Sequence, residues 1–73
     1  MTLSELKKNA TGHIARLELN GAIRRRLQDI GFVPGAAVTC LRRSPLGDPS
    51  AYSVCGAIVA IRKAEAEHVI LYE

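Results

Sequence analysis

The sequence predicts a mainly β fold, a small barrel of about five short strands with a short inserted helix and short helical turns near both ends. Short apolar stretches separated by turn residues are typical of such strands, and one segment with helical spacing interrupts them. The 73 residues leave room for one small core, and closing the sheet would remove exposed strand edges. We therefore expect residues 1–73 to form a single domain.

The inserted helix is predicted over residues 21–30. Three apolar residues spaced i, i+4 and i+7 share one face of it: Ile23, Leu27 and Ile30. Asn20 precedes the helix as a suitable N-cap, and Gly31 follows it, where a positive φ commonly ends a helix. We expect a short plug wedged between strands, with Phe32 buried directly after it.

The strands are predicted over residues 13–19, 37–43, 50–55, 58–62 and 69–72. The first needs a bulge at Ala15-Arg16 to bring its apolar residues to one face. The fourth is nearly all apolar and β-branched, which favours a central position. Helical turns are expected from the capping box at Thr2 through Lys8 and over residues 63–67, and a reversal is expected at Gly56-Ala57.

Composition and charge narrow the range of functions that the chain can have. Apolar residues make up 48% of the chain and charged residues 23%, which is typical of a globular protein. The formal charge of +3 permits an acidic partner. No GxxxxGK phosphate loop is present, and the carboxylates are scattered. Because so short a chain has little room for a pocket that excludes water, we do not expect an enzyme.

The expected location is the cytoplasm. The first residues carry neither a basic nor an apolar signal region. The longest apolar run, Ala57–Ile61, is far shorter than the ~20 residues that cross a bilayer. Direct membrane insertion is therefore not expected.

Four side chains are candidate ligands of a transition metal: His13, Cys40, Cys55 and His68. They lie far apart in the sequence. If the second and third strands pair, Cys40 and Cys55 can fall opposite one another, whereas a shift of one residue would separate their faces. The alternative is that both cysteines are small buried apolar residues, with reduced thiols.

Three segments in register resemble the ferrous iron transport protein A (FeoA) family. Residues 26–35, RLQDIGFVPG, resemble the pattern R-L-x-x-[LM]-G-[LF]-x-P-G, and residues 43–49, RSPLGDP, resemble R-x-P-L-G-[DG]-P. Residues 54–66 are similar to V-x-G-x-x-[IL]-A-[LI]-R-x-x-[ED]-A. The chain departs from many members at Asn9-Ala10, where they have Pro-Gly, and at Cys55, where they often carry a polar residue.

The resemblance implies an SH3-like barrel in the cytoplasm of a bacterium or archaeon. It implies an accessory or regulatory protein that docks on the cytosolic part of FeoB, a membrane transporter that imports ferrous iron. Weak binding of Fe(II) or another divalent transition metal fits this setting. Related domains end metal-dependent repressors, so the alternative function is a transition-metal-sensing domain.

The predicted partner contacts are Leu46, Arg25, Arg26, Arg43, Gly47 and Asp48. Leu46 stands in a loop between two prolines, where it either caps one barrel end or forms a pre-ordered apolar anchor. The arginines form either a solvated face or a footprint for an acidic protein surface, and Arg26 can also lay its stem across the barrel mouth.

A nucleic-acid partner is not expected. Single-strand binders need exposed aromatic side chains on which bases stack, and the aromatic residues are only Phe32, Tyr52 and Tyr72. The sequence leaves the oligomeric state open.

Overall fold

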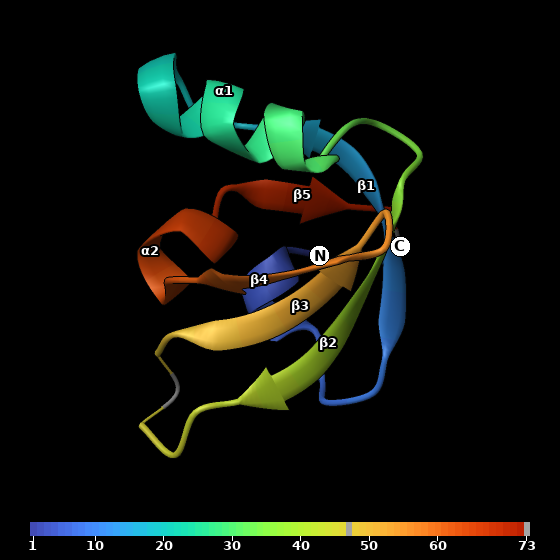
Figure 1. The fold of residues 1–73 in the computed structure, drawn as a ribbon, viewed down its shortest axis with the longest axis vertical. Coiled ribbons are helices and arrows are strands. Elements are labelled where there is room, and N and C mark those ends of the chain that lie inside the picture. The colour runs from blue at the N-terminus through green and yellow to red at the C-terminus, as the bar shows by residue number, and fades with distance from the viewer. Residues whose placement is uncertain (47, 73) are drawn as a thin grey trace.

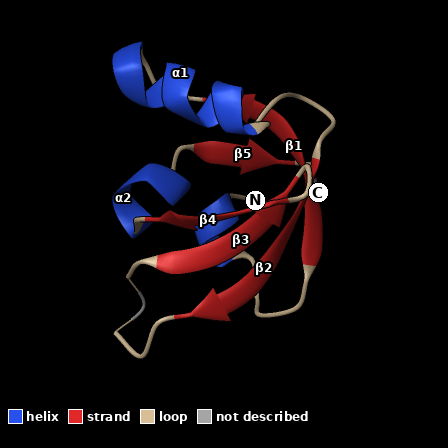
Figure 2. Cartoon of the chain, viewed as in Figure 1, coloured by secondary structure: helices blue, strands red, loops and turns tan. Residues whose placement is uncertain are grey.

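The computed structural model describes residues 1–46 and 48–72 and is mainly β, with two short helices and a 3-10 turn (Figures 1 and 2). The elements in chain order are η1 (Leu3–Glu5), β1 (Thr11–Leu17), α1 (Gly21–Ile30), β2 (Ala37–Arg43), β3 (Ser50–Val54), β4 (Ala57–Ile61), α2 (Lys63–Ala66) and β5 (Val69–Leu71). The predicted architecture is confirmed: an SH3-like arrangement of five antiparallel strands with an inserted helix.

One bent strand organises the sheet, whose order is β4-β3-β2-β1-β5. The first half of β1 pairs with β2, from Thr11↔Thr39 to His13↔Ala37, and the second half pairs with β5. The register shifts between Ile14 and Arg16, so the predicted bulge is confirmed. This bend lets the sheet curl around its core, although β1 begins and ends two residues earlier than predicted.

The sheet is an incompletely closed barrel. Within the described residues, no ladder joins β4 to β5, which are the two edge strands. The predicted central position of residues 58–62 was therefore wrong: the observed strand β4 pairs only with β3, and Ile58 is 75% exposed. The apolar run indicated burial on both faces, but only alternate residues of β4 face inward, with Ile61 buried at its end.

The core lies inside the curled sheet. Its buried hydrophobic residues are Leu3, Leu6, Ile14, Leu27, Phe32, Val38, Cys40, Tyr52, Val54, Ile61, Ala66, Val69 and Leu71. The prediction that Phe32 is buried is thus confirmed. The N-terminal turn and α2 each contribute to this core. Such contributions matter because a domain of this size buries only roughly 60% of its unfolded surface.

Helix α1 has the predicted bounds but lies across one end of the barrel instead of being wedged between strands (Figure 1). Leu27 is fully buried and Ile30 is partly buried, whereas Ile23 is 43% exposed. The predicted placement of Ile23 on the core face was therefore wrong, because the core reaches only the C-terminal half of the helix. Asn20 occupies the N-cap position without a side-chain hydrogen bond to the helix.

The end of α1 is fixed by backbone hydrogen bonds. The N–H of Phe32 donates to the carbonyl of Leu27 at 2.9 Å, and Gly31 adopts a φ of +124°. A Cβ at Gly31 would lie 2.8 Å from Sγ of Cys55, so glycine is required here both for its φ and for the close approach of the β3–β4 turn.

The β3–β4 turn consists of Cys55 and Gly56, both with positive φ, at +49° and +81°. The predicted reversal at Gly56-Ala57 was therefore displaced by one residue. Two successive positive φ values are typical of the two-residue hairpin loop that matches the twist of its strands. The following strand consequently begins at Ala57, one residue earlier than predicted.

A pair of substitutions on α1 tests how far the core extends along this helix. Leu27→Ala is expected to lower the free energy of unfolding by about 2–5 kcal/mol, because it leaves a cavity in the core. Ile23→Ala is expected to change it by less than about 0.5 kcal/mol, as at an ordinary surface position. Urea unfolding measures both values, and equal losses would contradict the observed placement of the helix.

Candidate functional site

The predicted partner contacts fall into two groups at opposite ends of the molecule's long axis, which measures 29 Å (Figure 1). We call Pro45, Leu46, Asp48 and Pro49, in the β2–β3 loop, the loop surface. We call Arg24, Arg25 and Arg26, on α1, the arginine surface. Gly47, also predicted as a contact, lies outside the described residues. The predicted contacts are therefore spread over two separate surfaces.

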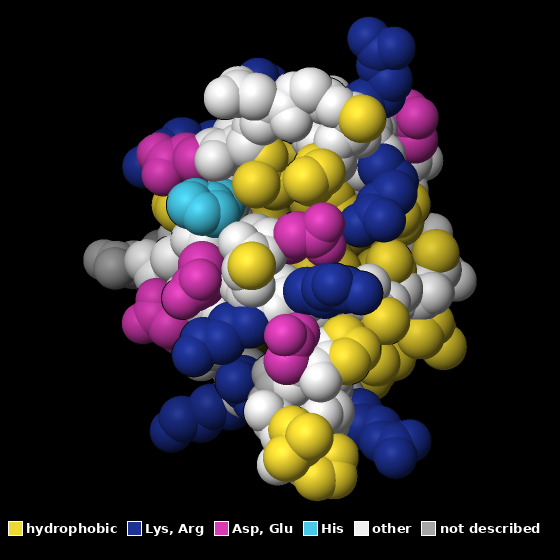
Figure 3. Space-filling model, turned by 90° about the vertical axis from the view of Figure 1, so that its left-hand side faces the viewer, with side chains coloured by type: hydrophobic (Ala, Val, Ile, Leu, Met, Phe, Trp, Pro, Cys, Tyr) yellow, Lys and Arg dark blue, Asp and Glu magenta, His cyan; other side chains and the backbone are white. Residues whose placement is uncertain are grey.

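Leu46 projects into solvent. Its side chain is 92% exposed, which contradicts the alternative that it caps a barrel end. In the space-filling view, hydrophobic side chains stand out at the foot of the molecule, where Figure 1 places the β2–β3 loop (Figure 3). The N–H of Leu46 donates to Oγ of Ser44 at 3.3 Å, and that hydroxyl donates to the carbonyl of Asp48. The loop thus presents an apolar side chain from an internally bonded turn.

A shallow, mainly apolar hollow of about 250 Å³ lies beside the loop surface. Its lining residues are Arg42, Ser44, Pro45, Pro49, Ser50, Ala51 and Ala60. The small side chains of Ala51 and Ala60, which are paired across β3 and β4, form part of its floor. Because a projecting leucine stands next to a hollow, the loop end offers a partner both a side chain to enclose and a surface to contact.

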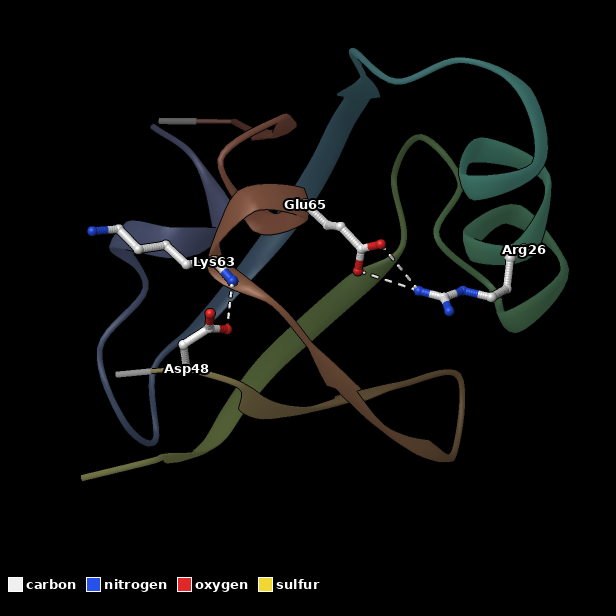
Figure 4. Close-up of polar contacts among 4 residues, drawn as sticks. All are labelled: Arg26, Asp48, Lys63 and Glu65. Carbon is white, nitrogen blue, oxygen red and sulfur yellow. Dashed lines mark hydrogen bonds and ion pairs between the residues drawn. The ribbon is translucent and has the colours of Figure 1, made fainter. Parts of the chain in front are cut away.

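Two of the predicted contacts hold the chain together locally. Oδ1 of Asp48 accepts a hydrogen bond of 2.9 Å from the N–H of Lys63, the first residue of α2 (Figure 4). Nη1 of Arg43 donates to the carbonyls of Ser4 and Leu6, at 3.1 and 2.9 Å. All three hydrogen bonds join segments far apart in the sequence, so no local pattern could have indicated them.

On the arginine surface, Arg26 reaches from α1 to α2. Its Nη2 lies 3.2 and 3.4 Å from the two carboxylate oxygens of Glu65 (Figure 4). The Arg26 side chain is 58% exposed, so this ion pair adds little stability. Arg24 and Arg25 form no ion pair with the described residues. Their charges lie in the N-terminal half of α1, where the helix dipole is also positive.

The four candidate metal ligands do not come together. Cys40 is buried and lies opposite Tyr52, whereas Cys55 is exposed in the β3–β4 turn. Of the two arrangements left open by the sequence, the cysteines are therefore separated, and only Cys40 is the expected buried apolar residue. His13 and His68 are both exposed. Among residues 1–46 and 48–72, no three His, Cys, Asp or Glu side chains are grouped as a metal site requires. The donor set does not fit a resident metal.

Structural contacts shift the pKa of Tyr52 and that of Glu5. Burial raises the pKa of Tyr52, and a hydrogen bond with Ser50 partly offsets this effect. Hydrogen bonds from Thr2, from its backbone first, lower the pKa of Glu5 in the capping box of η1. Neither group is placed to exchange a proton with a ligand in a cavity.

In the part of the chain that the structure describes, no helix has the length and hydropathy needed to cross a bilayer.

Comparison with known proteins shows that the sequence of this chain matches a known family. A family model described as the FeoA domain matches residues 1–72. A Fe(2+) transport protein A/Fe(2+) transporter FeoB fusion protein of Porphyromonas gingivalis is 35% identical over 69 residues, which are 94% of this chain. The chain spans only 8% of the length of that fusion protein.

Solved structures agree with this match. The FeoA protein from Chlorobium tepidum has a TM-score of 0.93 and 39% identity, covering 99% of this chain and 69% of its own. Stenotrophomonas maltophilia FeoA complexed with zinc has a TM-score of 0.86 and 34% identity, covering 99% and 89%. A manganese-dependent transcriptional repressor matches at 0.82 with 19% identity, covering 99% of this chain and 41% of its own, and shows a shared fold alone.

The hydrogen bond from Lys63 to Asp48 can be tested by a matched pair of variants. Asp48→Ala removes the acceptor at the first turn of α2 and is expected to cost about 0.5–2 kcal/mol, as loss of an N-cap does. Asp48→Asn keeps an acceptor oxygen and is expected to retain most of that stability. Thermal unfolding measures both, and equal destabilisation by the two variants would contradict a capping role.

Proposed function

Because the chain belongs to the FeoA domain family, a family of ferrous iron transport, we propose that it is an accessory protein of ferrous iron uptake. In this proposal it works in the cytoplasm, where it docks on the cytosolic part of a FeoB-type transporter and modulates it. It contributes a shaped surface and catalyses no reaction. Ferrous iron is the cargo of the transporter, and no resident metal is needed.

The observation that supports this most directly is the fusion protein. In the Porphyromonas gingivalis relative, a segment 35% identical to this chain belongs to the same polypeptide as a Fe(2+) transporter. Covalent linkage keeps two domains at a high effective concentration. Where a member of the family is not fused to the transporter, a non-covalent contact between the two surfaces has to supply the same proximity.

The loop surface is the proposed anchor of this contact. Enclosing a leucine that is 92% exposed in an apolar pocket contributes roughly 1.5–3 kcal/mol. The prolines on both sides and the hydrogen bonds through Ser44 hold the loop before binding, which lowers the entropic cost of association. Asp48 and Arg43 support the loop and the neighbouring N-terminal turn through their bonds within the chain.

The arginine surface is assigned a different part in the same contact. It lies at the far end of the molecule from Leu46 (Figure 1), so the two surfaces do not form one compact patch. Arg24 and Arg25 form no ion pair with the described residues, and exposed cations of this kind act over longer distances and raise the rate of encounter with an acidic partner. Arg25 is therefore proposed to steer the approach, with Leu46 holding the complex.

The alternative function, transition-metal sensing, has weaker support. The likeness to metal-dependent repressors is one of fold at 19% identity, and the candidate ligands of this chain are dispersed. No observation on the described residues favours this alternative over docking.

Leu46→Ser tests the anchor. The variant is expected to weaken binding to the purified cytosolic domain of the transporter about tenfold or more, mainly through faster dissociation. Tyr72→Ser, at an apolar position that is 61% exposed and away from the loop, is the control and should bind normally. Surface plasmon resonance measures the association and dissociation rates of both variants. Unchanged binding by a Leu46→Ser protein that keeps its melting temperature would remove the loop from the interface.

Arg25→Glu tests steering. It is expected to lower the association rate several-fold at low salt, with the difference shrinking as ionic strength rises and screens the charges. Lys8→Glu makes the same change in net charge at an exposed position of the N-terminal segment and should have a smaller effect. Stopped-flow binding at two salt concentrations distinguishes them, and equal effects of both variants would contradict a localised role for α1.

A further inference from the structure

Among the described residues, no strand pairs with the outer edge of β4, although β4 is regular along its whole length. Its five residues pair with β3 without a register shift, from Val54↔Ala57 to Ser50↔Ile61. On the side away from β3, the backbone of residues 57–61 makes no hydrogen bond to any other described residue. This edge therefore carries a row of free donors and acceptors.

The opposite edge of the sheet, formed by β5, is covered. The N–H of Leu71 in β5 donates to the carbonyl of Met1 at 2.8 Å, and Thr2 forms a β-bridge with Ile70. The N-terminal segment thus covers the β5 edge. If a second copy of the chain approached the sheet, the edge that it would find uncovered is therefore that of β4 and not that of β5.

The β4 edge also lacks the usual features that block strand addition. Proteins commonly protect an edge with charged side chains, proline or a bulge. The strand reads Ala-Ile-Val-Ala-Ile, with no charge and no proline. Ile58 is 75% exposed and Ala60 is also exposed. A smooth apolar edge of this kind is a template for another strand.

The hairpin geometry identifies the free backbone groups. In a two-residue hairpin the closing pair, here Val54 and Ala57, is hydrogen-bonded, and the bonded pairs then alternate. Ala57, Val59 and Ile61 accordingly direct their N–H and C=O groups toward β3. The groups of Ile58 and Ala60 point away from it, into the open edge.

We infer that β4 is a self-association edge, at which two copies of this chain pair their β4 strands antiparallel about a two-fold axis at Val59. In this register Ile58 of one copy lies opposite Ala60 of the other, and each of these two pairs exchanges two hydrogen bonds. A bulky side chain then meets a small one at both positions. The two isoleucines become diagonal neighbours and shield each other from water.

Charge does not oppose this register. The nearest cation along the chain, Arg62, lies opposite Gly56 of the second copy, so no like charges face each other across the new ladder. A symmetric pairing uses the same strand on both sides and therefore closes at two copies. A head-to-tail pairing of β4 with β5 would have to displace the N-terminal segment from its hydrogen bond to Leu71.

The contact is small, so the association is weak and reversible. One five-residue strand pair buries much less than the 1,200–2,000 Å² of a standard interface, and we expect a dissociation constant of about 0.1–1 mM. This inference uses neither Leu46 nor the arginine surface, but Ala60 also lines the hollow beside the loop surface. The Ile58 variants, which leave that hollow intact, therefore distinguish failure of the pairing from failure of the proposed docking.

Sedimentation equilibrium from about 0.05 to 2 mM protein, together with amide hydrogen exchange, tests the pairing. The average mass should rise with concentration toward that of two copies, and the amides of Ile58 and Ala60 should become protected as it rises. A single monomer mass over the whole range would overturn the inference. So would a dimer in which these two amides exchange as fast as in dilute protein.

Two pairs of variants separate loss of pairing from loss of folding. Ala60→Pro removes an outward N–H, as edge strands tolerate, and should weaken association at least about tenfold, while Ala60→Ser keeps the N–H and should dimerise. Ile58→Lys places cations near the two-fold axis and should also weaken association, whereas Ser53→Lys adds the same charge one strand away and should have less effect. If Ala60→Pro does not fold, the lysine pair decides. Dimerisation by a folded Ile58→Lys protein at wild-type strength would overturn the proposed edge.

Discussion

The barrel depends on the bend in β1. One strand supplies hydrogen-bonding partners to β2 with its first half and to β5 with its second, and the register shift between Ile14 and Arg16 lies where it changes partner. Without that bend the same five strands would form an open sheet with one face exposed. Because β1 turns, β5 is carried over the inner face of the β2–β3–β4 sheet, and the core residues of both halves meet.

The same bend determines where the chain leaves the sheet. Helix α1 follows β1 and lies across one end of the barrel, whereas the β2–β3 loop projects at the other end (Figure 1). Polar contacts between distant segments hold these outlying parts. Asp48 bonds to the first turn of α2, Glu65 of that helix pairs with Arg26, and Arg43 holds the N-terminal segment. In a domain with so small a core, such contacts restrict loops that burial alone would leave free.

Local patterns in the sequence predicted the elements well. The bounds of α1 and β2 were confirmed because Gly31, Pro34 and the loop prolines mark their ends. The errors concern how far burial extends. Helical spacing showed which residues share a face with Leu27, but not that the core stops before Ile23. An apolar run in β4 indicated burial, but a single strand carries no information about whether one or both of its faces are covered.

The site was harder to predict than the fold, since a site depends on which distant residues meet. The motif residues around Leu46 and Arg26 were found together by resemblance, yet the fold places them at opposite ends. Arg43 ends β2 and Asp48 stands in the loop that follows it, but their partners, Ser4, Leu6 and Lys63, are not marked as partners by any local pattern. The register of β2 against β3 likewise separates Cys40 from Cys55.

The proposed pairing at β4 and the proposed docking at the loop constrain each other geometrically. The β2–β3 loop lies near the end of β4 that holds Ile61, because Ser50, which follows the loop, pairs with that residue. A two-fold axis at Val59 reverses the strand direction, so the two Leu46 side chains of a dimer would lie at opposite ends of the assembly. A partner that encloses one Leu46 then has to extend across both copies to reach the other. Dimerisation would therefore add little avidity to docking on a partner that encloses one leucine. Substitution of Leu46 alters docking alone and substitution of Ile58 alters pairing alone, whereas a change at Ala60 affects both surfaces, because Ala60 also lines the hollow beside the loop.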